Sequence, residues 1–548
     1  MNLVLILTNV FITYFVFASG IINAEEFKLD YSIAASELPP VEVVGNKFFN
    51  TDTKEQFFIK GIAYQPSHSS DLQSLEALGS DAKYIDPLAS PELCLRDVPY
   101  LANLGVNTIR VYSIDPNKSH DVCMKALLEK GIYVLVDLSE PDASISRDTP
   151  NWDARVYQRY KNVVDAMHQY PNVLGFFAGN EVTNDITNTD ASPFVKASIR
   201  DVKEHISKMN YREIPVGYST NDDEDTRENL AKYFTCGESI ADFYGVNMYE
   251  WCGYSSFHTS GYDKRTQEFR NYPVPIFFSE FGCNLIRPRP FTEVEALYSK
   301  QMTDVWSGGL AYMYFEEENH YGVVKIDSNN HVVVLKDFEF LRDEFARANP
   351  KGTIKSEYLR RLELANKKPP RRECPALSSN WKAAEGLPAT PNQSKCACLD
   401  NALPCLVSPF SDRSKYREYF EYICGEVDCT DIAADGENGR YGEFSDCSAD
   451  QKLALEISKM FYSGADGAEA CPIADENIHF NSEFKNKPQD PKCATLILSI
   501  ENVSKARTAG DRNLNRSNNG IASSGSHKQT AEWILFLMAF GIWTGWLL

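Results

Sequence analysis

Histidine is scarce in this chain, and the motifs of several common enzyme classes are missing. The 548 residues include nine His, and none of them forms an HExxH motif or a close pair. The phosphate-cradling GxxxxGK, the dinucleotide-binding GxGxxG and the esterase motif GxSxG are also absent. Nucleotide-dependent chemistry and the commonest serine-esterase chemistry therefore have no support in the sequence.

Basic residues are also in short supply. The chain has 55 Lys and Arg against 76 Asp and Glu, which gives a net charge of -21. Binding to a phosphate backbone requires a basic face, so we expect no nucleic-acid partner. With 43% hydrophobic residues the chain is nevertheless too apolar to be disordered. Its length allows several domains, although an α/β barrel can occupy roughly 250 residues by itself.

The N-terminal end is apolar. Residues 3–18 are almost wholly apolar, and no acidic residue precedes Glu25. The run is too short and too near the start to be a good membrane span, so it predicts a secretory signal peptide, although the usual preceding basic residue is missing. We place cleavage after Ala24, with Gly20 as the alternative site; the alternative role is a membrane anchor.

The C-terminal end is apolar as well. Residues 533–548 form a run of sixteen residues, shorter than the roughly twenty that span a membrane. A polar spacer, residues 521–532, precedes this run, and the small-residue site Asn518-Asn519-Gly520 precedes the spacer. This order is typical of a glycosylphosphatidylinositol (GPI) attachment signal, and we predict attachment at Asn518. The alternative is a tail-anchored helix.

Fourteen cysteines fit the oxidising compartment that these end signals imply. The number is even, and in that compartment we expect the cysteines to form disulfides. Four Asn-x-Ser sequons predict N-glycosylation in the same compartment, at Asn117, Asn392, Asn502 and Asn515.

Strand-like and helix-like segments alternate from about residue 41 to residue 350. The clearest helical segment, Asp153–Gln169, follows Pro150 and is stopped by Pro171. Eight short apolar segments predict strands: Phe57–Tyr64, Val106–Tyr112, Ile132–Leu138, Val173–Gly179, Ile214–Tyr218, Phe243–Tyr249, Pro275–Ser279 and Leu310–Phe315. Eight β-then-α units predict an α/β fold of the (β/α)8 barrel type, with an open doubly wound sheet as the weaker alternative.

The pattern changes after the barrel. Residues 367–372, Lys-Lys-Pro-Pro-Arg-Arg, indicate a linker, and Cys396 to Cys493 contains eight cysteines, enough for a small disulfide-rich domain with 105 pairings in principle. Residues 501–530 are rich in Ser, Asn, Gly and Arg and predict a flexible stalk. The division we expect is a signal peptide (1–24), a barrel (25–350), a linker (351–395), a mainly helical cysteine-rich module (396–495), a stalk (496–518) and a removed propeptide (519–548).

Two glutamates follow predicted strands at the end where barrel enzymes hold their active sites. Glu181 follows the fourth strand and Glu280 follows the seventh. Two carboxyl groups at one barrel mouth are the minimum for retaining glycoside chemistry, which requires one protonated group and one ionised group about 5 Å apart. The alternative for either residue alone is a helix cap or an ion pair with Arg. The pair, with Asn180 directly before Glu181, favours catalysis, because an adjacent Asn can bind the 2-OH of the sugar.

Other polar and aromatic residues also fall at strand ends. Tyr112, Asp137, Tyr249 and Tyr312 do so, and we expect them to bind sugar hydroxyls or to orient a catalytic glutamate. Trp251, Tyr254 and Tyr321 are candidates for stacking on sugar rings, with loop packing as the alternative. The run Glu316-Glu-Glu-Asn319 indicates a solvated face without a catalytic role.

Longer motifs make a family resemblance specific. The barrel motifs that carry it are Gly179-Asn-Glu-Val-Thr-Asn184, Ser219-Thr-Asn-Asp222, Asn247-Met-Tyr-Glu-Trp-Cys-Gly-Tyr254, Phe278-Ser-Glu-Phe-Gly-Cys283 and Trp306-Ser-Gly-Gly-Leu-Ala-Tyr-Met-Tyr-Phe315. They resemble the fungal Gas/Gel/Phr proteins, the cell-wall β-1,3-glucanosyltransferases of glycoside hydrolase family 72. The run Asn438-Gly-Arg-Tyr-Gly-Glu-Phe-Ser-Asp-Cys447 resembles the cysteine-rich carbohydrate-binding module of family 43.

The resemblance implies a reaction and the residues that perform it. Glu181 matches the acid/base and Glu280 the nucleophile, and the donor-site residues match Tyr112, Asn180, Tyr249 and Tyr312. An internal β-1,3 bond is cleaved, and the new reducing end passes to the non-reducing end of another β-1,3-glucan chain. The resemblance implies neither a metal nor an organic cofactor. The implied disulfides are Cys94–Cys123, Cys236–Cys374, Cys252–Cys283, Cys396–Cys447, Cys398–Cys493, Cys405–Cys471 and Cys424–Cys429.

The location and partners follow from the same resemblance and from the two end signals. We expect a monomer held by its GPI anchor at the outer face of the plasma membrane or in the cell wall. Its partners are β-1,3-glucan chains, as donor and as acceptor. Two alternatives stay open: an endo-β-1,3-glucanase that uses the same two glutamates, and a glucan-binding wall protein whose barrel is inactive.

Overall fold

The computed structural model describes most of the barrel and of the cysteine-rich module. The described residues are 38–66, 84–364, 372–464 without 411 and 413, 470–484, and 491–504 without 492 and 503. The predicted signal peptide, Asn515, Asn518 and the apolar C-terminal run lie outside these residues. Among the described residues, no helix is both long enough and apolar enough to cross a membrane.

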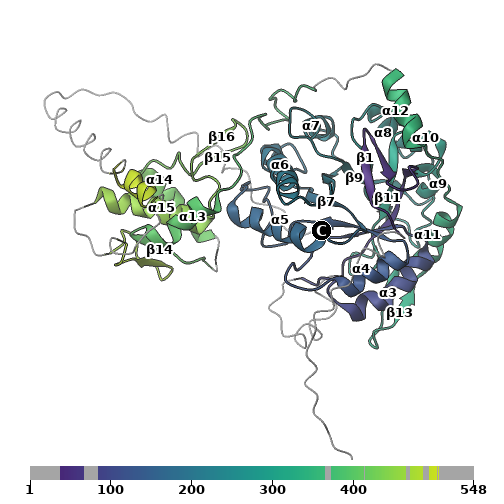
Figure 1. The fold of residues 1–548 in the computed structure, drawn as a ribbon, viewed down its shortest axis with the longest axis horizontal. Coiled ribbons are helices and arrows are strands. Elements are labelled where there is room, and N and C mark those ends of the chain that lie inside the picture. Colours follow the sequence, from purple (N-terminus) through teal and green to yellow (C-terminus); the bar gives the residue numbers. More distant parts are fainter. Residues whose placement is uncertain are drawn as a thin grey trace, which may run out of the picture.

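Eight parallel strands close into a barrel (Figure 1). In order around the barrel they are β4 (Ile59–Ala63), β5 (Thr108–Val111), β6 (Tyr133–Asp137), β7 (Val173–Asn180), β8 (Val216–Asn221), β9 (Tyr244–Cys252), β10 (Ile276–Cys283) and β11 (Trp306–Ala311). The last strand pairs with the first, in register from Gly308 and Ile59 onward. The predicted (β/α)8 barrel is therefore confirmed, and the open doubly wound sheet is excluded.

Helices surround the barrel. They are α3 (Pro91–Leu104), α4 (Asp121–Glu129), α5 (Ala154–Met167), α6 (Ser192–Lys208), α7 (Arg227–Tyr233), α8 (Tyr262–Glu268), α9 (Glu293–Leu297), α10 (Lys300–Thr303) and α11 (Lys336–Arg347). The carboxylate of Asp153 caps α5 by accepting hydrogen bonds from the backbone N–H groups of Arg155 and Val156. The apolar stripe of this helix, from Val156 to Met167, is buried against the sheet, so the helix predicted for this segment is confirmed.

One strand lies four residues before its predicted position. The prediction was Leu310–Phe315, but β11 spans Trp306–Ala311. The difference arises at Gly308, where a Cβ atom would lie 2.0 Å from the carbonyl oxygen of Ile59 on the neighbouring strand, and where φ is +92°. Only glycine permits this approach, and a search for apolar runs passes over such residues.

The N-terminal strands cover one end of the barrel. β1 (Val41–Val44), β2 (Lys47–Asn50) and β3 (Gln56–Phe57) form a small antiparallel sheet. Phe48 of β2 is fully buried, and its ring lies 6.3 Å from that of Phe243 and 6.0 Å from that of Phe277. This aromatic packing belongs to the end opposite the carboxyl termini of the strands, so it contributes to stability and leaves the catalytic end open.

Part of the segment predicted as a linker packs against the barrel. Trp381 is fully buried with its ring 5.3 Å from that of Tyr233 on the barrel, and Thr390 donates a hydrogen bond to Asp201 on α6 at 2.6 Å. Residues 372–392 are therefore packed against the barrel. Charge and proline content indicated a linker, whereas the single Trp was the residue that signalled packing.

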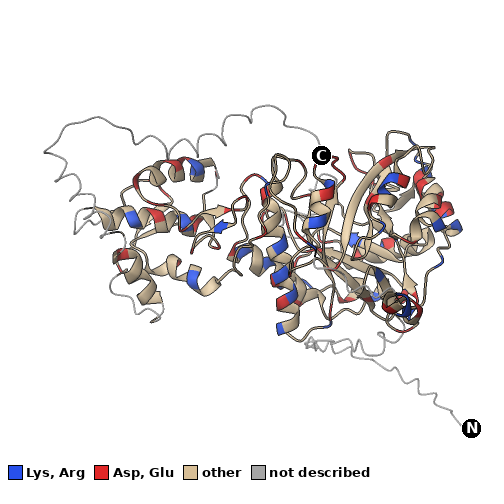
Figure 2. Ribbon diagram, turned by 90° about the horizontal axis from the view of Figure 1, so that it is seen from above, with Lys and Arg blue, Asp and Glu red and all other residues tan. Residues whose placement is uncertain are grey.

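The cysteine-rich module lies beside α5 and α6 (Figure 1). Its helices are α13 (Gln393–Ala402), α14 (Ser414–Glu426) and α15 (Ala449–Ser463), with the short strand pairs β14 (Cys405–Val407) with β17 (Ile478–Phe480) and β15 (Ala434–Asp435) with β16 (Arg440–Tyr441). Helical structure continues over residues 493–502, where Ile497 and Ile500 are buried in the core of the module. The packed module therefore extends past residue 495, where we placed its end, because these isoleucines complete its core. Figure 2 shows acidic and basic residues interspersed along the helices of both domains.

Seven disulfides use all fourteen cysteines, which all lie within the described residues. The pairs are Cys94–Cys123, Cys236–Cys374, Cys252–Cys283, Cys396–Cys447, Cys398–Cys493, Cys405–Cys471 and Cys424–Cys429. These are the pairs that the family resemblance implies. Cys252–Cys283 joins the carboxyl ends of β9 and β10, while Cys236–Cys374 attaches the segment before the module to the barrel.

Candidate active site

Both glutamates lie at the carboxyl end of the barrel. Glu280 lies within β10 with only 8% of its surface exposed, whereas Glu181 directly follows β7 and is half-buried. The backbone N–H of Glu181 donates a hydrogen bond to the carbonyl oxygen of Ser219 on β8 at 2.9 Å. Glu181 has φ of +49°, a left-handed conformation that is uncommon for a residue with a side chain.

Three side chains hold the carboxylate of Glu280. The hydroxyl of Tyr112 donates to Oε1 at 2.8 Å, and the hydroxyl of Tyr249 donates to Oε2 at 2.8 Å. A guanidinium nitrogen of Arg110 lies 3.5 Å from Oε1. All three favour the ionised carboxylate, and together they fix the plane in which its oxygens lie.

Burial nevertheless raises the pKa of Glu280 to about 7. The positive charge of Arg110 opposes this rise in pKa, the negative charge of Glu181 adds to it, and the hydrogen bonds from Tyr112 and Tyr249 oppose it. The interaction between the two carboxylates is evidence that they share one site. A glutamate that titrates near neutral pH in a barrel mouth is a candidate for catalysis.

Asn247 connects the two glutamates. Its amide nitrogen donates to Oε1 of Glu181 at 2.8 Å. Its amide oxygen accepts hydrogen bonds from the hydroxyls of Ser219 at 3.1 Å and Ser279 at 2.8 Å, and Ser279 directly precedes Glu280. Asn247 was not a predicted site residue, although it begins the motif that contains Tyr249.

Arg110 is the second residue that the sequence analysis missed. Its guanidinium is fully buried, lies 4.4 Å from the ring centre of Tyr112, and donates to Oδ1 of Asn180 at 3.0 Å. It also binds both carboxylate oxygens of Asp137, at 2.9 and 2.8 Å. A charged residue inside the apolar strand sequence Thr108-Ile-Arg-Val111 was the signal that could have identified it.

Asp137 is buried and paired with Arg110. It is 2% exposed, and both of its carboxylate oxygens accept hydrogen bonds from Arg110. Of the two roles expected for Asp137, binding a sugar hydroxyl or orienting a catalytic glutamate, these contacts favour the second, because Asp137 holds Arg110, which in turn contacts Glu280 and Asn180. Burial explains the pair, because a carboxylate inside a barrel requires a cationic partner.

Tyrosines form a wall beside Glu280. The ring of Tyr321 lies 5.8 Å from that of Tyr249 and 5.4 Å from that of Tyr312, whose ring in turn lies 6.5 Å from that of Tyr112. Four of the five tyrosines singled out in the sequence therefore belong to one cluster, and Tyr254 is the fifth. Aromatic side chains in this arrangement can stack on sugar rings and donate hydrogen bonds to hydroxyl groups.

The two other aromatic candidates differ in exposure. Trp251 is 5% exposed, and its indole N–H donates to Gly253 and to the hydroxyl of Thr292, so stacking on sugar is excluded for it. Tyr254 is 81% exposed and remains a candidate.

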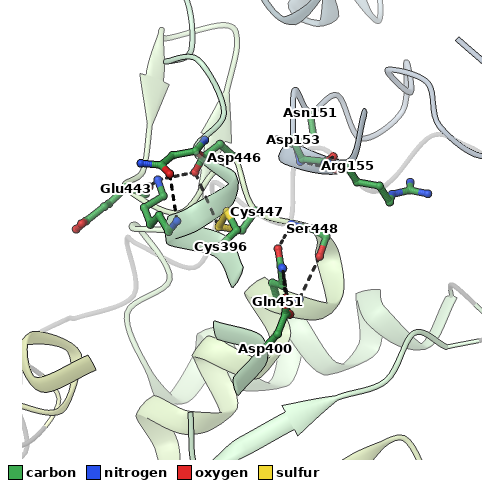
Figure 3. Close-up of a disulfide and its surroundings, with 12 residues drawn as sticks. Asn151, Asp153, Arg155, Cys396, Asp400, Glu443, Asp446, Cys447, Ser448 and Gln451 are labelled. Atoms are coloured by element: carbon green, nitrogen blue, oxygen red, sulfur yellow. Dashed lines mark hydrogen bonds and ion pairs between the residues drawn. A yellow bond between two sulfur atoms is a disulfide. The ribbon is translucent and has the colours of Figure 1, made fainter. Parts of the chain in front are cut away.

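The described residues also contain a large groove, of about 820 Å³, between barrel and module. Figure 3 shows part of its surroundings, with Asp153 and Arg155 on the barrel side and the Cys396–Cys447 disulfide on the module side. Neither catalytic glutamate lines this groove. Within the described part of the chain, one group has metal-ligand spacing, Cys396, Asp446 and Cys447, but its two sulfur atoms form a disulfide and offer no thiolate.

Comparison with known proteins identifies both domains. The sequence model of the family described as glucanosyltransferase matches residues 30–349, and that of the X8 domain matches residues 403–478. The chain is 57% identical to the 1,3-beta-glucanosyltransferase GAS2 of Saccharomyces cerevisiae, over 86% of this chain and 85% of the relative. It is 44% identical to the 1,3-beta-glucanosyltransferase gas1 of Schizosaccharomyces pombe, over 79% and 78% of the two chains.

Solved structures agree with these relationships. A glutamate-to-glutamine mutant of Saccharomyces cerevisiae Gas2p without ligand matches with a TM-score of 0.80 and 57% identity, over 86% of this chain and 98% of that chain. The same mutant in complex with laminaritetraose and laminaripentaose matches with a TM-score of 0.78, over 85% and 99% of the two chains. The chain therefore belongs to the glucanosyltransferase family, glycoside hydrolase family 72, and carries an X8 domain as its C-terminal cysteine-rich module.

Proposed function

We propose that this protein is a retaining β-1,3-glucanosyltransferase that elongates cell-wall β-1,3-glucan. The observation that carries the proposal is the pair Glu181 and Glu280 at the ends of β7 and β10, where Glu280 accepts hydrogen bonds from Tyr112 and Tyr249. The names of the relatives, and the laminari-oligosaccharides bound to one of them, support the substrate class.

The first half of the reaction forms a covalent intermediate. Glu181 donates a proton to the glycosidic oxygen as the C–O bond breaks, and a carboxylate oxygen of Glu280 bonds to the anomeric carbon. The reducing-end fragment leaves as an alcohol, and the glycosyl group stays on Glu280 as an ester. Tyr112, Tyr249 and Arg110 hold the attacking carboxylate in place before this step, which lowers the cost of orienting it.

The second half transfers the glycosyl group. Glu181, now ionised, takes the proton from the 3-OH of the acceptor, whose oxygen attacks the anomeric carbon and releases Glu280. Water is present at about 55 M, so transfer requires an acceptor sugar held at high effective concentration. The wall formed by Tyr112, Tyr249, Tyr312 and Tyr321 is the surface we assign to sugar binding.

The location belongs to the same proposal. A signal peptide that ends at Ala24 would direct the enzyme to the cell surface, and a GPI anchor at Asn518 would hold the monomer at the outer face of the plasma membrane, where donor and acceptor glucans are found. Seven disulfides suit that oxidising compartment. The sequons at Asn117 and Asn392 lie at exposed residues, as glycan attachment requires.

Product length tests the proposal. Soluble protein from Glu25 to Ser504, which includes the complete described module, is incubated with a β-1,3-gluco-oligosaccharide whose reducing end has been reduced. We expect mass spectrometry to show products longer than the substrate. Products that are only shorter, with one new reducing end for each bond cut, would identify an endo-β-1,3-glucanase, and absence of any turnover would favour a glucan-binding protein with an inactive barrel.

A further inference from the structure

The segment between β6 and α5, residues 138–153, is held at both of its ends. Near its start, Glu140 forms a 3.2 Å ion pair with Arg159 of α5 and accepts a hydrogen bond from the hydroxyl of Tyr84 at 2.7 Å. Ala143 and Ile145 are each only 4% exposed. The segment is therefore fixed on the barrel up to residue 145.

Its far end is fixed on the module. The backbone N–H of Ala154, the first residue of α5, donates to the carbonyl oxygen of Asp446 at 2.8 Å. Figure 3 shows Asp153, the residue before α5, near the part of the module that contains Asp446 and the Cys396–Cys447 disulfide. Residues 146–152, which lie between the two fixed ends, are consequently held in a defined place beside the barrel mouth.

Arg147 lies between these ends and reaches the acid/base. Its side chain is exposed, and one guanidinium nitrogen, Nη2, donates to the backbone carbonyl oxygen of Glu181 at 2.7 Å. A hydrogen bond from a charged donor at this distance is a strong one. Arg147 does not belong to the network around Glu280, which consists of Arg110, Tyr112 and Tyr249.

The backbone of Glu181 requires such a restraint. With φ of +49° it lies in the left-handed region, which is strained for a residue with a side chain. The N–H of Glu181 donates to the carbonyl oxygen of Ser219, and the N–H of Thr183 donates to the hydroxyl oxygen of Tyr218 at 3.2 Å. The hydrogen bond from Arg147 fixes the remaining peptide group, between residues 181 and 182.

We propose that Arg147 is a positioning residue for Glu181, which holds the backbone conformation that directs the acid/base carboxyl toward the glycosidic oxygen. The inference rests on the proposed function. Arg147 acts through Glu181 alone, so its loss should impair proton transfer and leave nucleophilic attack by Glu280 unchanged.

Leaving-group dependence tests this inference. A β-1,3-gluco-oligosaccharide has a sugar leaving group that needs a proton, whereas a 2,4-dinitrophenyl β-laminarioside has one that departs without it. We expect Arg147→Ala to lower kcat/KM about 10-fold or more for the oligosaccharide, since general acid catalysis contributes roughly 10²–10⁴-fold. For the dinitrophenyl substrate we expect kcat/KM, and the burst of dinitrophenolate, to stay within about twofold of wild type.

Two further variants complete the experiment. Arg147→Lys retains a cationic donor and should recover part of the lost activity on the oligosaccharide. Arg155→Ala removes an exposed arginine of α5 at the interdomain groove and should affect neither substrate. Equal losses on both substrates, or no loss on either, would overturn the role of Arg147. An inactive wild-type enzyme on both substrates would instead contradict the proposed function.

Discussion

At the scale of single residues, the two glutamates differ in what surrounds them. Glu280 is buried among Arg110, Tyr112 and Tyr249, and its pKa is raised to about 7, mainly by burial. Because the nucleophile must be ionised, glycosylation should slow as the pH falls through about 7. Tyr249→Phe removes a hydrogen bond to the ionised form, so the pKa should rise by about one to two units and the acid limb should move to higher pH.

The pH dependence of kcat/KM for the 2,4-dinitrophenyl substrate measures the pKa of Glu280, because this substrate needs no proton from the acid/base Glu181. Tyr422→Phe, which changes an exposed tyrosine on α14, is the control and should leave the profile in place. An acid limb at the same pH in wild type and Tyr249→Phe would show that Tyr249 does not stabilise the ionised nucleophile.

The same residue predicts a change in stability with pH. The pKa of Glu280 rises from 4.5 to about 7 on folding, so folding favours its protonated form. This contribution is complete below pH 4.5 and is lost as the pH rises to about 7, a change on the order of 3 kcal/mol. Glu280→Gln cannot ionise, so the difference between its melting temperature and that of wild type should increase in its favour from pH 4.5 to pH 7. A difference in melting temperature that is the same at both pH values would contradict the burial of an ionisable nucleophile.

At the scale of elements, the strands determine which residues meet at the barrel mouth. Counting apolar segments predicted all eight strands, and the residues just after them included both glutamates. It missed Arg110: a charge inside the apolar strand Thr108-Ile-Arg-Val111 was a signal, but its partner Asp137 becomes evident only when the barrel places the two residues opposite each other. It also misplaced β11, because the glycines that let this strand approach β4 carry no hydrophobic signal.

The ion pair between β5 and β6 predicts how Asp137 affects the reaction. Asp137→Asn removes one charge of a buried pair, and the loosened Arg110 should lower kcat several-fold while KM for a long oligosaccharide stays near that of wild type. Kinetics with laminari-oligosaccharides check this expectation. An increase in KM with unchanged kcat would instead restore Asp137 as a sugar ligand.

At the scale of the whole molecule, the barrel and the module form one packed unit. The family motifs predicted both domains, but charge and proline content indicated a linker for residues that are packed through Trp381 and Thr390. Such contacts depend on how two domains meet, which local composition does not encode. Asp446 shows the consequence, since its carboxylate accepts a hydrogen bond from the backbone of Asn392 and pairs with Lys395 at 2.6 Å, while its carbonyl oxygen binds Ala154.

Asp446→Ala should destabilise the protein by about 1–3 kcal/mol, because it removes a charged acceptor from the backbone N–H of Asn392 and from the ammonium group of Lys395. Denaturation by urea measures the change, with Glu426→Ala at an exposed position of α14 as the control. Equal stability of the two variants would mean that the carboxylate of Asp446 does not stabilise the start of the module around Asn392 and Lys395.

The central claim, a covalent intermediate on Glu280, is tested most directly by trapping it. A 2-deoxy-2-fluoro laminaribiosyl fluoride slows both halves of the reaction but, through its good leaving group, lets the glycosyl-enzyme accumulate. Peptide mass spectrometry of the inactivated enzyme should locate the sugar on Glu280, and Glu280→Gln should remain unlabelled. Label on any other residue, or rapid turnover of natural substrate by an enzyme that never becomes labelled, would contradict the two-glutamate mechanism.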